Sequence, residues 1–535
     1  MKRDILRTIS LWVRGLMLAL LSVSLVALFT QYAHAQVVRF AKSYGGTNDD
    51  WASSVQQTSD GGYIMAGRTR SFGAGGVDVF LIKTDEFGNL QWAKAYGRTG
   101  ADLAFSVQQT SDGGYIVAGY TTSFGAGGAD FFVVKTYANG NIQWAKTYGG
   151  TGADTAWSVQ QTSDGGYIVA GYTTSFGAGN NDIFLIKTDA NGDVQWAKAY
   201  GGAGDDRAYS VQQTSDGGYI VAGETRSFGA GGSDIFLIKT DEFGNVQWAK
   251  TYGGTNNEWA YSVQQTSDGG YIVAGTRRIS LNYDIFLIKT DANGNVQWAK
   301  TYAETNDDRA YSVQQTSDDG YIVAGTRRIS LNYDIFLIKT DANGNVQWAK
   351  TYGGGGEDRA YSVQQTSDGG YIVAGRTGSF GAGGSDIFLI KTDANGNIGS
   401  CGIVGNASPT VNTVSPTVNT PPLSVSSPSP TVNSVSPTVT TITTLTVNAP
   451  CPLSDDNELG ISETCQIAGG LITPYKGGIK VSGSGEFEVK VYNVSGGIVK
   501  SIKGKNEVKL ELSRGVYFVE VISGGKVLRE KVIIR

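Results

Sequence analysis

The chain has 535 residues and a formal net charge of −5, so its length allows several domains. Glycine accounts for 75 residues, about twice the usual share, whereas charged residues make up only 17% and aromatic residues 11%. This composition excludes a disordered polyelectrolyte and a coiled coil, and it is typical of a β-rich protein with many tight turns.

Residues 1–35 have the pattern of a signal peptide. Basic residues precede an apolar run from Gly15 to Phe29, and Ala33-His34-Ala35 supplies a small-residue cleavage signal. We therefore expect export, with an uncleaved anchor as the alternative. His34 is the only histidine. The mature chain then has none, which excludes Ser-His-Asp and Cys-His catalysis and histidine metal sites.

Residues 36–399 contain seven copies of one unit, marked by the string SVQQTSDGGYI. Its valine recurs every 52 and then every 50 residues, at Val55, Val107, Val159, Val211, Val263, Val313 and Val363. Each unit reads as four short strands, with Asp-Gly or Asn-Gly turns that supply the positive φ of tight hairpins. Four-stranded units of this length predict a seven-bladed β-propeller, with a β-solenoid as the alternative.

The two ends of the repeat region complement each other. The seventh unit lacks the QWAKTYGG strand, and the segment Val37 to Gly46 aligns with it, with Phe40 in place of tryptophan. We therefore predict that the N-terminal strand completes the last blade and closes the ring, which removes exposed sheet edges. The other six units keep a tryptophan that we expect to pack between blades: Trp92, Trp144, Trp196, Trp248, Trp298 and Trp348.

The repeat is similar to a known family. The run YGGTNDDWASSVQQTSDGGYIMAGRT, followed by DVFLIKTDEFGNLQWAKAYG, resembles the SBBP-type bacterial β-propeller repeat over about residues 37–398. The resemblance implies the propeller fold and an extracytoplasmic setting. It implies no catalytic residues, because the family is defined by its repeats and not by an activity.

Residues 400–465 are interpreted as a linker. The stretch 407–450 consists largely of Ser, Thr, Pro, Val and Asn with PTVN repeated, which predicts an extended, hydrated spacer away from any packed core. The three cysteines are Cys401, Cys451 and Cys465. Export favours one disulfide, with Cys451–Cys465 closing the shortest loop, but the pairing stays open.

Residues 466–535 alternate apolar and polar positions, which predicts a small β-sandwich. The segments Val491-Tyr492-Asn493, Gly515-Val516-Tyr517 and Lys531-Val532-Ile533 resemble the C-terminal (type A) sorting domain of type IX secretion substrates. The resemblance implies contact with the sorting machinery and a place at the cell surface, with outer-membrane attachment. A module that binds a wall component is the alternative.

The net charge differs between the two main parts of the mature chain. Residues 36–399 carry a net charge of −10 and residues 466–535 a net charge of +6. An acidic main domain disfavours nucleic acid as a partner, because nucleic-acid binding requires a basic footprint.

Acidic residues recur at two positions of every unit. One precedes the first strand: Asp50, Asp102, Asp154, Asp206, Glu258, Asp308 and Asp358. The other opens the third strand: Asp78, Asp130, Asp182, Asp234, Asp284, Asp334 and Asp386. Both positions lie on the same face of a propeller. We expect these carboxylates to cap turns, with calcium binding as the alternative.

Ligand recognition is expected where the units differ. Two variable positions on that same face carry aromatic and arginine side chains, which suit stacking on sugars or docking a protein. The candidates are Trp51, Tyr120, Tyr172, Arg207, Trp259, Arg309 and Arg359.

These observations predict a secreted, surface-attached binding or adhesion scaffold, a monomer that binds an extracellular glycan or protein. No phosphate loop, nucleophile elbow or metal-ligand spacing is present in the sequence, so neither an enzyme nor a cofactor is expected. The alternative is a glycan-active enzyme that uses carboxylates only, with Glu224, Glu304 and Glu357 as candidates because they break the repeat.

Overall fold

The structure is a computed structural model that describes residues 38–304, 307–399, 402–429, 431–435, 438–442, 445–451, 465–467, 470–475, 478–493, 498–511, 515–523 and 526–534. The expected signal peptide and Cys401 lie outside these residues. The chain divides into two compact units, Met1–Ser454 and Asp455–Arg535. In the described parts, no helix has the length and apolar character needed to cross a membrane.

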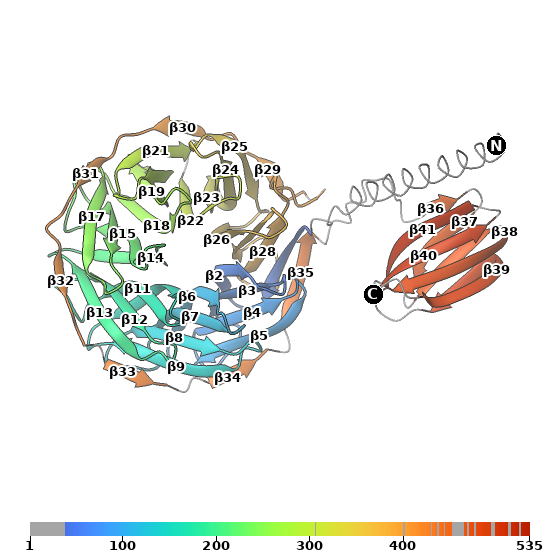
Figure 1. Cartoon of the computed structure of the whole chain (residues 1–535), viewed down its shortest axis with the longest axis horizontal. Coiled ribbons are helices and arrows are strands. Elements are labelled where there is room, and N and C mark those ends of the chain that lie inside the picture. Colours follow the sequence, from blue (N-terminus) through green and yellow to red (C-terminus); the bar gives the residue numbers. More distant parts are fainter. Residues whose placement is uncertain are drawn as a thin grey trace, which may run out of the picture. The chain divides into compact units, whose positions relative to one another are not determined.

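The first unit contains seven blades arranged in a ring (Figure 1). Blade 1 consists of β2 (Asp50–Gln57), β3 (Tyr63–Thr69), β4 (Asp78–Thr84) and β5 (Leu90–Gly97); blade 2 of β6 (Asp102–Gln109), β7 (Tyr115–Thr121), β8 (Asp130–Thr136) and β9 (Ile142–Gly149); blade 3 of β10 (Asp154–Gln161), β11 (Tyr167–Thr173), β12 (Asp182–Thr188) and β13 (Val194–Gly201). Blade 4 consists of β14 (Asp206–Gln213), β15 (Tyr219–Thr225), β16 (Asp234–Thr240) and β17 (Val246–Gly253); blade 5 of β18 (Glu258–Gln265), β19 (Tyr271–Ile279), β20 (Asn282–Thr290) and β21 (Val296–Ala303); blade 6 of β22 (Asp308–Gln315), β23 (Tyr321–Ile329), β24 (Asn332–Thr340) and β25 (Val346–Tyr352). We call the four strands A to D, from the centre outwards.

Blade 7 takes its strands from both ends of the repeat region, as the sequence predicts. It contains β26 (Asp358–Gln365), β27 (Tyr371–Thr377), β28 (Asp386–Thr392) and, as strand D, the N-terminal β1 (Phe40–Gly45). β1 pairs antiparallel with β28, with Phe40 opposite Lys391 and Tyr44 opposite Ile387. Phe40 is fully buried and packs edge-on against Tyr63 of blade 1, with ring centroids 6.1 Å apart.

Aromatic side chains of strand D join each blade to the next. The tryptophans of QWAK pack on the first tyrosine of the next strand B, as in Trp196 on Tyr219 at 5.8 Å. A buried tyrosine four residues further on donates its O–H to the glycine carbonyl of the next C–D turn, as in Tyr200 to Gly244 at 2.7 Å. The tryptophan and the tyrosine of the repeated QWAK-x-Y segment therefore join each blade to the next.

The expected spacer is instead a second circuit around the ring, and this corrects the sequence interpretation. It forms seven strands: β29 (Val404–Asn406), β30 (Thr410–Thr413), β31 (Thr417–Asn419), β32 (Ser424–Ser426), β33 (Thr431–Ser434), β34 (Thr438–Thr441) and β35 (Thr446–Cys451). They pair antiparallel with strand D of blades 6, 5, 4, 3, 2, 1 and 7 in that order. We call this segment, drawn in orange around the blades in Figure 1, the belt.

The belt has a seven-residue period that matches one blade per repeat. β30 to β34 begin seven residues apart, and apolar residues between the strands pack against the cores between adjacent blades, as Val414 and Val435 do. Their backbone N–H groups also donate to strand D carbonyls, Val414 to Ala299 and Val435 to Ala145, both at 3.0 Å. The outer edge of each blade therefore gains a hydrogen-bonded belt strand. This strand is the edge strand of its sheet, a position that tolerates proline, so the proline-rich chain can pair there in register.

The described residues of the second unit form six strands in one hydrogen-bonded sheet: β36 (Cys465–Ile467), β37 (Gly470–Tyr475), β38 (Gly478–Asn493), β39 (Ile498–Glu511), β40 (Gly515–Ser523) and β41 (Lys526–Ile534). The long β38 pairs with β39 along one edge, and with β37 and then β40 along the other. The predicted alternation of residues 466–535 is thus realised as strands.

Candidate functional site

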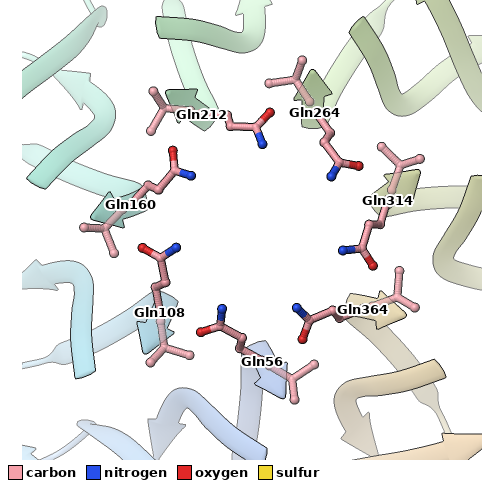
Figure 2. Close-up of a pocket in the computed structure, with 14 residues that line it drawn as sticks. Gln56, Gln108, Gln160, Gln212, Gln264, Gln314 and Gln364 are labelled. Carbon is pink, nitrogen blue, oxygen red and sulfur yellow. The ribbon is translucent and has the colours of Figure 1, made fainter. Parts of the chain in front are cut away.

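The seven strands A line the centre of the ring, and glutamines surround one end of it. The pore glutamines point toward the axis in Figure 2: Gln56, Gln108, Gln160, Gln212, Gln264, Gln314 and Gln364. Each side-chain oxygen accepts from a backbone N–H of the next strand A at 2.5–2.6 Å, a cycle that ends with Gln364 bonding to Gln57. These side chains bind neighbouring blades to one another and leave an open hollow of about 240 Å³.

A second cavity, of about 280 Å³, lies further along the strands A toward their N-terminal ends. Its wall is formed by Trp51, Ser53, Arg68, Phe105, Trp157, Tyr209, Tyr261, Tyr311 and Tyr361. We call it the aromatic cavity. Six of the seven blades contribute an aromatic ring from the same position of strand A, and blade 1 contributes Ser53.

A β-bulge places these residues on the wall. In every blade the pairing of strands A and B skips one residue, for example between Ala208 and Ser210, and the skipped residue is the one that lines the cavity. A bulge re-aims a side chain out of the regular alternation of a strand. Tyr209 and its equivalents are therefore half-buried and turned toward the centre and not into an inter-blade core.

The aromatic rings touch in sequence around the cavity. Phe105 and Trp157 stack at 4.1 Å with their planes 13° apart, and Trp157 meets Tyr209 edge-on at 5.2 Å. Tyr209, Tyr261, Tyr311 and Tyr361 continue the series at 5.3, 5.3 and 5.4 Å between centroids. Such a series presents a large, rigid surface on which a ring can stack.

Blade 1 interrupts the series and supplies charge. Ser53 leaves a gap beside Tyr361, and Trp51 lies there with the guanidinium groups of Arg68 at 3.5 Å and Arg376 at 4.1 Å from its ring centroid. The buried indole nitrogens of Trp51 and Trp157 have no hydrogen-bond acceptor among the described residues. The cavity thus combines aromatic surface with one cationic side chain, that of Arg68.

The structure places one predicted ligand-binding residue, Trp51, on the cavity wall. The others lie at the ends of the same strands or of strands B beside them. Arg207, Arg309 and Arg359 lie over Tyr172, Tyr283 and Tyr333 at 5.2, 4.2 and 4.4 Å. Tyr120 packs on Phe105 at 6.0 Å, and Trp259 packs on Tyr283 at 5.7 Å.

The acidic residues predicted to precede strand A are its first residues; they are buried and accept hydrogen bonds from the adjacent loops. Asp50 accepts from the N–H of Gly46 at 2.8 Å and from the hydroxyl of Ser71 at 2.7 Å. The same arrangement recurs with small changes at Asp102, Asp154, Asp206 and Asp358. In blades 5 and 6, where the B–C loop is shorter, Arg277 and Arg327 take the place of the hydroxyls and pair with Glu258 and Asp308.

The acids that open strand C lie close to these capping residues in the next blade. Asp78 accepts from Ala74 and Gly75 N–H through one oxygen, while its other oxygen has no partner among the described residues. Burial raises the pKa of Asp78 to about 6, and the nearby charge of Asp102 adds to the shift. Gly97 passes between the two carboxylates, where any Cβ would collide with both.

The carboxylates considered for catalysis are occupied by ion pairs. Glu224 is buried, accepts the O–H of Tyr209 at 2.8 Å and pairs with Arg207 at 3.4 Å. Glu304 pairs with Arg327, and Glu357 pairs with Arg359 at 3.3 Å and Arg376 at 3.0 Å.

The aromatic positions of the bulge are functional candidates that sequence reasoning missed. They were interpreted only as part of strand A, because the tyrosine of AYSVQQ looks like a regular strand residue. The one available signal is that this position carries Ser53, Phe105 and Trp157 in the first three units while the flanking residues stay constant.

Comparisons with known proteins identify the C-terminal segment. The family of secretion system C-terminal sorting domains matches residues 473–535. The regulatory protein FlaEY of Caulobacter vibrioides is 26% identical over 207 residues, 34% of this chain and 21% of that protein, so the match spans about a fifth of that relative.

Two solved structures resemble the propeller. Sqt1 from Chaetomium thermophilum has a TM-score of 0.39 and 12% identity, over 62% of this chain and 81% of that one. A protein of unknown function from Dyadobacter fermentans has a TM-score of 0.39 and 14% identity, over 66% of this chain and 99% of that one. With its seven blades and its matched C-terminus, the chain is a β-propeller repeat protein that carries a type IX secretion sorting domain, and it is a secreted protein of the cell surface or extracellular space.

Proposed function

We propose that the protein is a surface binding or adhesion scaffold whose ligand occupies the aromatic cavity. The observation that carries the proposal is the series of six aromatic rings, one from each of blades 2 to 7, that lines the cavity. Structural aromatic residues pack into cores, as the QWAK tryptophans do here. A ligand with apolar faces would cover the rings that line the cavity.

Binding without turnover is the favoured form of this function. A retaining or inverting glycosidase requires two carboxyl groups that flank the scissile bond. Glu224 is the candidate acid beside the cavity, and it is held by Arg207 and Tyr209. The cavity wall itself consists of aromatic residues, one serine and one arginine.

A binding screen with the mature chain tests the proposal. We expect retention of a subset of ligands on a glycan array and on a panel of extracellular proteins, with no cleavage products. Trp157→Ala and Tyr261→Ala should each remove that retention, because both residues line the cavity. Phe243→Ala is the matched control, since Phe243 is 60% exposed on a C–D turn. Retention that survives both cavity variants would place the ligand elsewhere.

A further inference from the structure

The mouth of the aromatic cavity is asymmetric although the ring is built from repeats. Blades 6, 7 and 1 are neighbours and contribute four arginines at the positions flanking the bulge: Arg309, Arg359, Arg376 and Arg68. Two carboxylates accompany them. Glu357 pairs with Arg359 and Arg376, and Asp307 accepts the O–H of Tyr333 at 3.2 Å. Glu357 therefore compensates two of the four arginines, Arg359 and Arg376.

Arg68 is the arginine of this arc that reaches the cavity wall. Its guanidinium lies against Trp51, and no carboxylate among the described residues lies within ion-pair distance of it. Burial, together with the charge of Arg70, lowers the pKa of the Arg68 guanidinium, as expected for a cation without a counter-ion. A half-buried cation of this kind is costly unless an anion completes its environment.

The adjoining arc, in blades 2 and 3, is uncharged. The equivalent positions there are Leu103, Tyr120, Thr155 and Tyr172, and the stacked pair of Phe105 and Trp157 lies beside them. A ligand in the cavity thus meets the Arg68 cation beside a wall of aromatic rings. At about 280 Å³ the cavity is close to the lower limit for small-molecule sites, which suits one or two sugar rings.

We propose that the aromatic cavity binds an acidic saccharide, with a uronate carboxylate against Arg68 and the pyranose ring stacked on the Phe105–Trp157 arc. The inference rests on the proposed binding function and names its ligand class. A pyranose ring has apolar faces and hydroxyl edges, so it can pack on the aromatic wall while its carboxylate meets Arg68. Trp and Tyr faces are suited to such amphipathic rings.

The test titrates uronate oligosaccharides, such as oligogalacturonate, into the mature chain and follows tryptophan fluorescence and heat. We expect the free acid to bind at least about tenfold more tightly than its methyl ester, and added salt to weaken the acid alone. Arg68→Gln should remove that preference, because it lowers the affinity for the acid far more than the affinity for the ester. Arg70→Gln is the matched control, because Arg70 is exposed, pairs with Asp49 and lies outside the cavity wall.

The outcomes separate this inference from the binding function. Equal affinity for acid and ester, an unchanged preference in Arg68→Gln, or no uronate binding at millimolar concentration would each overturn the acidic-saccharide assignment. Binding of acidic peptides in place of uronates would do the same. If any of these ligands still depends on Trp157, the cavity remains the binding site. If Trp157→Ala changes no ligand's affinity, the proposed function itself fails.

Discussion

Truncation of Phe40 tests whether the N-terminal strand stabilises the ring. Phe40→Ala removes a fully buried ring that packs on Tyr63 of blade 1, so the variant loses about 3–5 kcal/mol of unfolding free energy. The propeller with its belt has roughly 410 residues, for which the entropy of unfolding is about 0.9 kcal/mol/K. We therefore expect Tm to fall by about 3–6 °C.

Tryptophan fluorescence isolates this transition, because residues 38–451 contain nine tryptophans and residues 466–535 contain none. Phe243→Ala, an aromatic truncation at an exposed turn, should change the unfolding free energy by less than about 0.5 kcal/mol. The reasoning is refuted if Phe40→Ala melts within about 1 °C of the Phe243→Ala control.

Three further predictions concern the acidic residues and the tail. Burial raises the pKa of Asp308 to about 8 and those of three strand C aspartates to about 6, so the folded chain holds protons that the unfolded chain releases above about pH 4. Thermal stability should therefore fall as pH rises from 5 to 8, and Asp308→Asn should flatten the upper part of that fall. Millimolar calcium should leave Tm unchanged, because the capping carboxylates already accept hydrogen bonds; a rise of several degrees that Asp206→Asn abolishes would show a calcium site. Deletion of residues 466–535 should retain a folded, ligand-binding propeller in the periplasm, and its appearance at the surface in cell fractionation would contradict the sorting role.

The propeller was predictable because its signals are local and repeated. Asp-Gly and Asn-Gly turns define the hairpins, and the strand missing from the seventh unit defines the closure by Phe40 and its neighbours. The belt was not predictable in the same way. Its strands have three to six residues and lack hairpin turns, and five of the seven follow prolines, so their composition resembles that of a hydrated linker. They exist because the outer edge of each blade offers partners.

The candidate site was likewise predictable only in part. Variation between the units identified Trp51, which lies on the cavity wall. Tyr209 and its equivalents were not predicted, because the alternation of apolar and polar residues along a strand does not reveal a bulge. The bulge inserts one residue, and a side chain that would otherwise face a neighbouring blade then points toward the axis. The asymmetry of charge at the mouth also depends on closure, since Arg68 and Arg376 become neighbours only when blade 1 meets blade 7.

The belt determines how the propeller bears mechanical load. The chain leaves the ring through β35, which pairs with β1, so tension applied beyond residue 451 acts first on that pairing. The six belt strands behind it would detach one after another, each held by a few hydrogen bonds, before any blade loses its own four strands. When a surface-tethered protein with a bound ligand is pulled, its belt thus lengthens in small steps. The pairing is restored when the tension ends, because the released segment can pair again with the intact blades.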